Sequence, residues 1–372
     1  MSSVHTPFIA RGPGQHVRTL DSSRQSHPRR EKSAPLSTTL RSGSLGSEHD
    51  EPRQLASSQT GSDRAFLVIT RSIAAVVLLV TGGIGLFLAR SAIPTFHHYG
   101  WSFFTETQWT PESDVLGIGS VLVGTFTVAF VAISVAFPLA LLTALYIAEY
   151  APTGLRPTLV SLVDLMAAIP SIIYGLWGFF LLQPRASPFA HWLHVHLGFI
   201  PFFRVDADPH AAVWEQTRYT ASAFIAGLAV AMMVIPMACA VMRQVFSQAP
   251  PGEREAAFAL GATHWGVVKT VVLPFGKGGI IGGTMLGLGR ALGETIAVLL
   301  IVSPSFDLKV KPLEVGTNTV SALIAGRFGE ATSSQLQALL TAGFVLFLIT
   351  LGINTIAATI VVRSRSGAGA EA

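Results

Sequence analysis

Six long apolar segments are the feature of this sequence that most restricts its fold. They cover roughly residues 66–89, 121–147, 159–182, 220–242, 279–302 and 338–362. Each is close to the ~20 residues that an α-helix needs to cross the hydrocarbon core of a bilayer. In lipid, every backbone N–H and C=O must find a partner within the protein, which a bundle of helices achieves. The sequence therefore predicts an all-α, polytopic membrane protein with six transmembrane helices.

The composition fits a membrane protein everywhere except at the N-terminus. Only 12% of the 372 residues are charged, whereas soluble domains carry about a quarter. Residues 1–62 differ, with 13 serines and one aromatic residue. Such a segment cannot bury enough apolar surface to offset the entropy lost on ordering, so it favours disorder. We predict a disordered cytoplasmic tail at 1–62, a membrane domain at 63–365 and a short C-terminal tail at 366–372.

Basic residues indicate the orientation. With six spans, the N-terminal tail, the segment 243–278 and the C-terminus share one side of the membrane. Beyond the tail, that side carries Arg243, Arg254, Lys269, Lys277, Arg363 and Arg365, and loops rich in Lys and Arg stay in the cytoplasm. The opposite loops also hold basic residues, so the margin is small. We predict that both termini are cytoplasmic.

The fifth apolar segment carries two charges at membrane depth. Its core reads GLGRALGETIAVLL and places Arg290 twelfth in residues 279–302, about 18 Å along a helix and close to the midplane. An arginine and a carboxylate there cost about 5–7 kcal/mol on the insertion scale, and the Leu, Ile and Val residues return only about 3–7 kcal/mol. We therefore expect Arg290 and Glu294, four residues apart on one helix face, to face the bundle interior or a wet cavity.

Small residues and prolines predict how the segments pack. Gly283/Gly287 and Gly289/Gly293 have the four-residue spacing that lets helix backbones approach closely. Pro170 predicts a kink in the third segment. In the same segment, we expect Asp164 to pair with a basic residue or to cap the kinked helix.

The segment between the fourth and fifth spans predicts a helix–turn–helix. Glu253 and Glu255 follow two prolines and a glycine, where carboxylates suit the dipole of a helix N-terminus. Gly261 permits a sharp turn, and Thr263 can cap a second short helix that ends at Pro274. The segment contains no catalytic constellation, and its shape suits docking into a partner's cleft.

The same segment resembles the EAA loop of ABC importer permeases. That pattern is EAA-xxx-G, nine residues, then I-x-L-P. It is matched here by Glu255, Ala256, Ala257, Gly261, Leu273 and Pro274, with Val271 in place of Ile as the one departure. The resemblance extends over roughly residues 66–365, and GRALGETIAV is similar to the PstC subunits of phosphate permeases rather than to their PstA partners. The resemblance implies that the loop forms a coupling helix held in a groove of an ATPase.

The resemblance also implies the partners. It predicts a PstA-like second permease subunit, two copies of a PstB-like ABC ATPase, a PstS-like phosphate-binding protein and membrane lipid, with no nucleic acid, in a bacterial cell (inner) membrane. The chain has no G-x-x-x-x-G-K-[ST] motif. We therefore expect no cofactor, no metal site and no enzymatic activity in this chain, and ATP and Mg²⁺ on the ATPase partner.

The resemblance gives Arg290 and Glu294 a hypothetical role in the substrate pathway. The planar guanidinium of Arg290 suits phosphate-like oxyanions, and Glu294 would hold it while the pathway is empty. A buried structural pair is the alternative. Sulfate, molybdate or tungstate remain open as other cargoes, because arginine recognises them all. An ion-coupled secondary transporter is a further alternative, although the halves show no repeat, and an intramembrane enzyme would need a nucleophile or metal cluster.

Overall fold

A computed structural model describes residues 61–205 and 215–365. Of the predicted N-terminal tail, only Gly61 and Ser62 fall within this range, and both belong to the first helix. The rest of that tail and the predicted tail at 366–372 lie outside the described residues.

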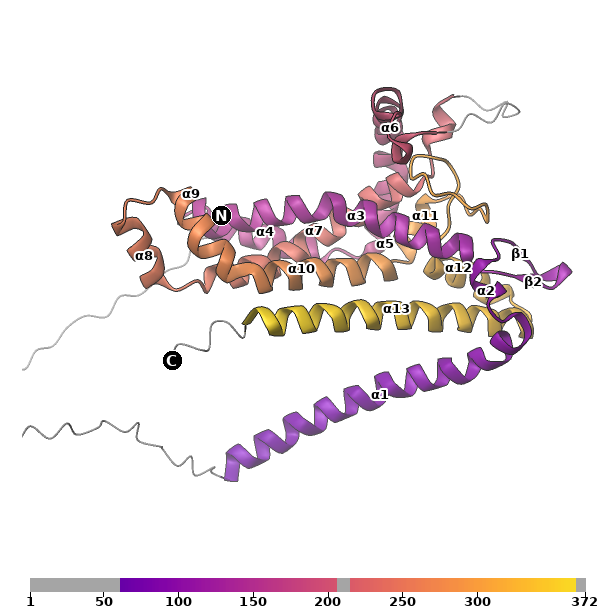
Figure 1. Cartoon of the computed structure of the whole chain (residues 1–372), viewed down its shortest axis with the longest axis horizontal. Coiled ribbons are helices and arrows are strands. Elements are labelled where there is room, and N and C mark those ends of the chain that lie inside the picture. Colours follow the sequence, from indigo (N-terminus) through magenta and orange to yellow (C-terminus); the bar gives the residue numbers. More distant parts are fainter. Residues whose placement is uncertain (1–60, 206–214, 366–372) are drawn as a thin grey trace, which may run out of the picture. The chain divides into compact units, whose positions relative to one another are not determined.

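The described chain is helical, as predicted, with one pair of two-residue strands (Figure 1). The long helices are α1 (Gly61–Tyr99), α3 (Gly119–Leu145), α7 (Ala223–Ser247), α10 (Leu273–Gly293) and α13 (Ser333–Arg365). The shorter helices are α2 (Ser102–Thr105), α4 (Arg156–Ala168), α5 (Ser171–Trp177), α6 (Gln183–Leu197), α8 (Pro251–Ala259), α9 (His264–Val267), α11 (Ile296–Ile301) and α12 (Val320–Arg327). The strands are β1 (Trp109–Thr110) and β2 (Val115–Leu116).

Three five-residue π-helical segments continue these helices. They are η2 (Tyr146–Tyr150) after α3, η3 (Gly178–Leu182) between α5 and α6, and η6 (Val268–Val272) between α9 and α10. Short 3₁₀ turns are η1 (Pro111–Ser113), η4 (Pro201–Phe203), η5 (Glu215–Tyr219) and η7 (Phe328–Glu330).

Five helices of the described part are long and apolar enough to cross a membrane. They are Gly61–Tyr99, Gly119–Tyr150, Ala223–Ser247, His264–Gly293 and Ser333–Val361, which correspond to five of the six predicted spans. The third predicted span is instead a broken pair, Arg156–Ala168 and Ser171–Leu197, bent by 89°. The helical content, five spans and the bend at Pro170 agree with the prediction, but the third span consists of two helices and not of one kinked helix.

Helices α3, α7 and α10 form the core of the bundle (Figure 1). Gly227 of α7 faces α3, where a Cβ would lie 2.6 Å from the Cβ of Val131. Gly283 and Gly287 of α10 face α7, where a Cβ on Gly287 would lie 2.6 Å from Cγ1 of Val234. These contacts require glycine because any side chain would force the helix backbones apart.

The second predicted glycine pair behaves differently. A Cβ on Gly289 would lie 3.2 Å from Oδ1 of Asn354 on α13, so Gly289 does serve a close helix contact. A Cβ on Gly293 would meet nothing within 4 Å of it. The prediction of close packing is therefore confirmed for Gly283, Gly287 and Gly289 and is wrong for Gly293, at which α10 ends.

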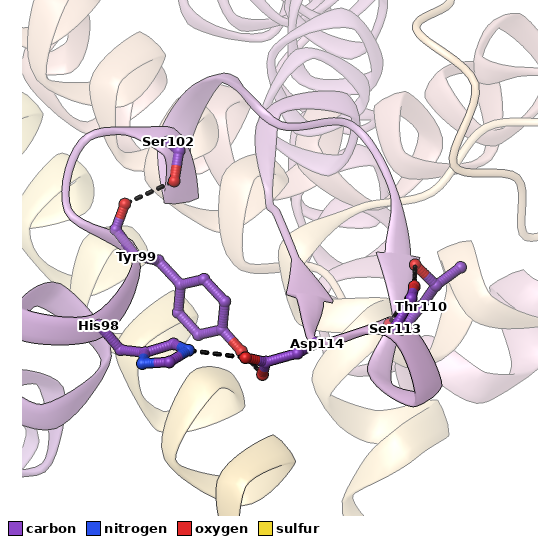
Figure 2. Close-up of polar contacts among 6 residues, drawn as sticks. All are labelled: His98, Tyr99, Ser102, Thr110, Ser113 and Asp114. Carbon is purple, nitrogen blue, oxygen red and sulfur yellow. Dashed lines mark hydrogen bonds and ion pairs between the residues drawn. The ribbon is translucent and has the colours of Figure 1, made fainter.

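A hairpin is attached to the C-terminal end of α1 by one carboxylate (Figure 2). Asp114 has a left-handed backbone (φ 55°) between β1 and β2. Its Oδ1 accepts a hydrogen bond of 2.7 Å from the Tyr99 hydroxyl, and its Oδ2 lies 2.8 Å from Nε2 of His98. These contacts, the tyrosine first and the histidine second, lower the pKa of Asp114 below its ordinary value.

Candidate functional site

The first helix break of the candidate site lies between α4 and α5. Pro170 has no N–H, and its ring disfavours a helical conformation at Ile169, whose ψ is 129°. The hydroxyl of Tyr174 donates a hydrogen bond of 2.8 Å to the carbonyl oxygen of Met166, across the break. A carbonyl at the end of α4 is thereby satisfied, which makes a broken helix tolerable at membrane depth.

The second break interrupts the predicted fifth span. Helix α10 ends at Gly293, and α11 begins at Ile296. The carbonyl oxygen of Glu294 accepts a hydrogen bond of 2.6 Å from the Ser321 hydroxyl, and that of Gly293 accepts one of 3.1 Å from the Thr295 hydroxyl. The prediction of one continuous helix through residues 279–302 is therefore wrong, because side-chain hydroxyls replace the helical hydrogen bonds.

The segments that follow the two breaks pack against each other. A Cβ on Gly175 of α5 would lie 2.8 Å from the Cα of Ala297 on α11. A Cβ on Gly178 would lie 2.5 Å from Cδ1 of Ile301. Both breaks therefore border one region of the bundle, which we call the break site and define by Pro170, Tyr174, Arg290, Glu294 and Thr295. Discontinuous helices of this kind build the substrate sites of many transporters.

Arg290 lies near the middle of the bundle. Gly287, one turn earlier, contacts Val234, the twelfth of the 25 residues of α7. The Arg290 guanidinium is near enough to Tyr174 to act on it electrostatically. Its Nε is buried, and among the described residues Arg290 makes no hydrogen bond or ion pair. Arg290 therefore lies at about the level of the middle of α7.

The structure contradicts the predicted shared helix face of Arg290 and Glu294. Glu294 lies past the end of α10, with an extended ψ of 129°, and its side chain turns toward α11. Its Oε1 accepts a hydrogen bond of 3.3 Å from the N–H of Ala297, and the residue is 8% exposed. A carboxylate is favoured there because the first N–H groups of a helix carry partial positive charge. Glu294 therefore caps α11, and it does not hold the Arg290 guanidinium in this structure.

The segment between α7 and α10 forms the predicted helix–turn–helix. Helix α8 carries Glu255, Ala256 and Ala257, and the chain then turns at Gly261, whose φ is +85°. Glycine suits this position because residues with a Cβ atom avoid positive φ. The Thr263 hydroxyl caps α9, accepting a hydrogen bond of 3.2 Å from the N–H of Gly266. The turn and both helix starts are confirmed.

The predicted end of the second helix at Leu273 and Pro274 is wrong. The helix runs from His264 to Gly293, through η6 and into α10, with Pro274 in the first turn of α10. The π-helical η6 lies directly before the proline. An extra residue per turn removes the clash between a proline ring and the preceding turn of the helix, so the helix continues.

The tip of this loop exposes apolar side chains. Phe258, Leu260 and Trp265 are 43%, 90% and 59% exposed, and α8 has no buried residue. Glu255 and Ala256 are exposed as well, while Ala257 is half-buried. Large apolar side chains exposed at the tip of a loop are typical of a docking surface.

Two ion pairs join charged residues that are far apart in the sequence. Arg243 Nη2 lies 3.5 Å from Asp164 Oδ1, which confirms that Asp164 pairs with a basic residue. Arg254 Nη2 lies 2.9 Å from Glu149 Oε1, which no motif indicated, because about a hundred residues separate the partners. In the described chain, no group of three or more His, Cys, Asp or Glu side chains has the geometry to hold a metal ion.

Known proteins similar to this chain are permeases. Residues 136–365 match the model of the family described as binding-protein-dependent transport system inner membrane component. The PstC phosphate transport system permease protein of Xylella fastidiosa is 36% identical over 303 residues, covering 81% of this chain and 91% of the relative. The PstC protein of Pasteurella multocida is also 36% identical, over 298 residues, with coverages of 80% and 91%.

One solved structure agrees in fold. A chain of a bacterial alginate ABC transporter in complex with a periplasmic protein has a TM-score of 0.51 and 17% sequence identity, covering 79% of this chain and 93% of that one. The helical architecture, the EAA loop and these matches point to the same group of proteins. The chain therefore belongs to the family of inner membrane components of binding-protein-dependent transport systems, the ABC importer permeases.

Proposed function

We propose that this chain is the transmembrane subunit of an ATP-driven importer of inorganic phosphate, and that Arg290 contacts the anion on its way through the membrane. The chain is a transport subunit and not an enzyme. As a member of its family, it works with another permease subunit, an ATPase and a substrate-binding protein. Phosphate is the cargo named for relatives 36% identical to it. From the PstC name of these relatives we infer PstA-like, PstB-like and PstS-like partners.

The observation that carries the assignment of Arg290 is its lack of a partner within the described residues. Leaving a buried or half-buried guanidinium group unpaired is costly. Arg290 is half-buried, its Nε has no hydrogen-bond partner, and the nearby carboxylate of Glu294 is used to cap α11. A planar group with five N–H donors recognises a tetrahedral oxyanion well. Glu294 holds the start of α11 in place beside it.

The break site also supplies a means of conformational change. Helix α11 has six residues, and α5 is the first seven residues of the helix Ser171–Leu197. An irregular backbone separates each from the helix before it. Such junctions absorb changes of backbone angle with few packed contacts to break. We infer that movement of α5 and α11 relative to α4 and α10 opens and closes the pathway around Arg290.

The loop end of the bundle, where α7 ends and α8 follows, is assigned to the cytoplasm. The exposed Phe258, Leu260 and Trp265 then form the surface offered to the ATPase, together with Glu255 and Gly261. In this orientation both termini are cytoplasmic, and the binding protein delivers its cargo at the opposite end. ATP and Mg²⁺ bind to the ATPase and not to this chain.

ATP-dependent uptake by the reconstituted complex tests this proposal. Wild-type proteoliposomes should accumulate labelled phosphate, and excess unlabelled sulfate or molybdate should compete poorly. Uptake of sulfate or molybdate in preference to phosphate would replace the proposed cargo while retaining the importer. Transport by the purified chain without ATPase or binding protein would refute the importer itself.

The role of Arg290 is tested in the same vesicles with Arg290→Gln. Glutamine keeps a polar side chain but removes the charge, so we expect uptake to fall by at least tenfold while the complex still assembles. Arg185→Gln is the matched control, because Arg185 is exposed and its guanidinium donates to the carbonyl oxygen of Leu181 on its own helix. Wild-type uptake by Arg290→Gln would show that the residue only braces the bundle.

A further inference from the structure

Arg254 joins three elements at the loop end of the bundle. It lies on α8, between Glu253 and the Glu255 of the EAA pattern. Its Nη2 lies 2.9 Å from Oε1 of Glu149, which belongs to η2 at the end of α3. The same Nη2 donates a hydrogen bond of 2.7 Å to the carbonyl oxygen of Phe246, in the last turn of α7. One nitrogen atom therefore connects α8 to both α3 and α7.

Both acceptors are placed to favour a cation. The Glu149 side chain is only 10% exposed, and that of Arg254 is 24% exposed, so water screens this pair less than an ordinary surface ion pair. The Phe246 carbonyl is one of the last of α7, where the helix dipole places partial negative charge. Removing Arg254 would leave a nearly buried carboxylate without its cation, which is strongly unfavourable.

Other side chains of α8 do not share this role. Of the α8 side chains, that of Arg254 is the only one that makes a hydrogen bond or ion pair with α3, η2 or α7 within the described residues. No residue of α8 is buried, and its apolar contacts are with the rest of the loop: the Phe258 ring lies 5.1 Å from that of His264 on α9, and α8 also contacts η6. The neighbouring α9 has a separate and weaker link to η2, a ring contact of 6.2 Å between His264 and Tyr150.

We propose that Arg254 is the positioning residue through which movement of α8 reaches the membrane helices. This inference rests on the proposed function. An ATPase bound to the exposed tip of the loop can move α8 as a unit. The ion pair with Glu149 and the hydrogen bond to Phe246 then transmit that movement to the ends of α3 and α7. Those two helices pack tightly on each other through Gly227 and Val131, so they carry the movement into the bundle together.

The experiment compares Arg254→Gln and Glu149→Gln in the full complex, with the second permease subunit, the ATPase and the binding protein, in lipid nanodiscs and proteoliposomes. Each variant removes one charge of the pair and retains a polar side chain of similar length. We expect normal co-purification of the ATPase and normal basal ATP hydrolysis. Stimulation of hydrolysis by the loaded binding protein should fall by about tenfold, within the usual range of coupling between distant sites, and phosphate uptake should fall with it.

Two further variants separate a coupling role from a structural one. Glu253→Gln is the matched control, because Glu253 is exposed on the same helix, and it should retain wild-type coupling. Arg254→Lys should recover a substantial part of the lost stimulation, because both contacts use a single nitrogen and an ammonium has three donors.

Three results would overturn the proposal. They are wild-type stimulation in Arg254→Gln, equal defects in the lysine and glutamine variants, and a defect fully explained by loss of bound ATPase. The wild-type complex controls for the proposed function. If it transports sulfate in place of phosphate, the cargo assignment fails, and the Arg254 comparison is made with sulfate.

Discussion

The tightest contact between α3 and α7 makes a quantitative prediction for Gly227→Ala. The added Cβ would lie 2.6 Å from both Cβ and Cγ1 of Val131, whereas carbon atoms in contact prefer about 3.5–4.0 Å. The helices must therefore separate by about 0.9 Å or more. The Cβ of Val131 is attached directly to the backbone and cannot rotate away, so the cost should reach the upper end of the usual overpacking range, about 3 kcal/mol.

Part of this cost is offset by helix propensity. Alanine is favoured over glycine by up to about 1 kcal/mol inside a helix, which leaves a net destabilisation of about 2 kcal/mol for Gly227→Ala. That corresponds to an approximately 30-fold larger unfolded fraction at a given denaturant concentration. Reversible unfolding of the purified complex by SDS titration in mixed micelles, followed by tryptophan fluorescence, measures it. Gly352→Ala is the control, because a Cβ there meets nothing within 4 Å and should be neutral or stabilising.

A double-mutant cycle tests whether Val131 causes the effect. In a Val131→Gly background the clashing carbon atoms are absent and only the Val128 carbonyl oxygen, 3.2 Å from the added Cβ, stays close, so Gly227→Ala should cost far less than in the wild type. In a Val131→Ala background the clashing Cβ remains, and Gly227→Ala should still destabilise the complex. Equal costs in the wild-type and Val131→Gly backgrounds would refute the packing argument, as would a Gly227→Ala complex as stable as the wild type.

Two further predictions concern the loop tip and the hairpin. Gly261→Ala should weaken ATPase co-purification, because a φ of +85° costs a non-glycine residue roughly 1–2 kcal/mol. Gly252→Ala is the control and should not weaken it, because the space around Gly252 is open. Equal ATPase binding by the two variants would contradict the proposed role of the turn. Because contacts with Tyr99 and His98 lower the pKa of Asp114, their stabilisation is present above the carboxyl's unfolded pKa and is lost as the pH falls through the folded value. Hydrogen exchange of residues 109–116, corrected for its intrinsic rate, should therefore rise at acid pH in the wild type and lose this dependence in Asp114→Asn.

The parts of the fold that follow from hydrophobic length and local chemistry were predictable. Five of the six spans, the Gly261 turn and the Thr263 cap follow from rules that involve only neighbouring residues. The contact between Glu149 and Arg254 does not, because it depends on how α3 and α8 meet in three dimensions. The same holds for Gly293, whose spacing matches a packing motif although nothing faces it.

Pro170 and Pro274 show why a proline alone does not determine the local structure. At Pro170 the chain breaks and bends by 89°, and the Tyr174 hydroxyl satisfies a carbonyl oxygen on the other side of the break. At Pro274 the helix continues, because the π-helical turn before it makes room for the ring. Each proline lacks a backbone N–H group, and the surrounding residues decide whether the helix breaks or continues.

The two charges of the fifth predicted span show how an energetic argument can miss a break in a helix. The insertion cost of the two charges predicts that they avoid lipid, and Glu294 is buried, at 8% exposed. The predicted shared face of Arg290 and Glu294 depended on a helix that continued to residue 302, in which Glu294 could hold the guanidinium. A break at Gly293 supplies free N–H groups at the start of α11, which take Glu294 as their cap. Arg290 is then left with a buried N–H group that no described residue uses, and its proposed role as the anion contact rests on this feature.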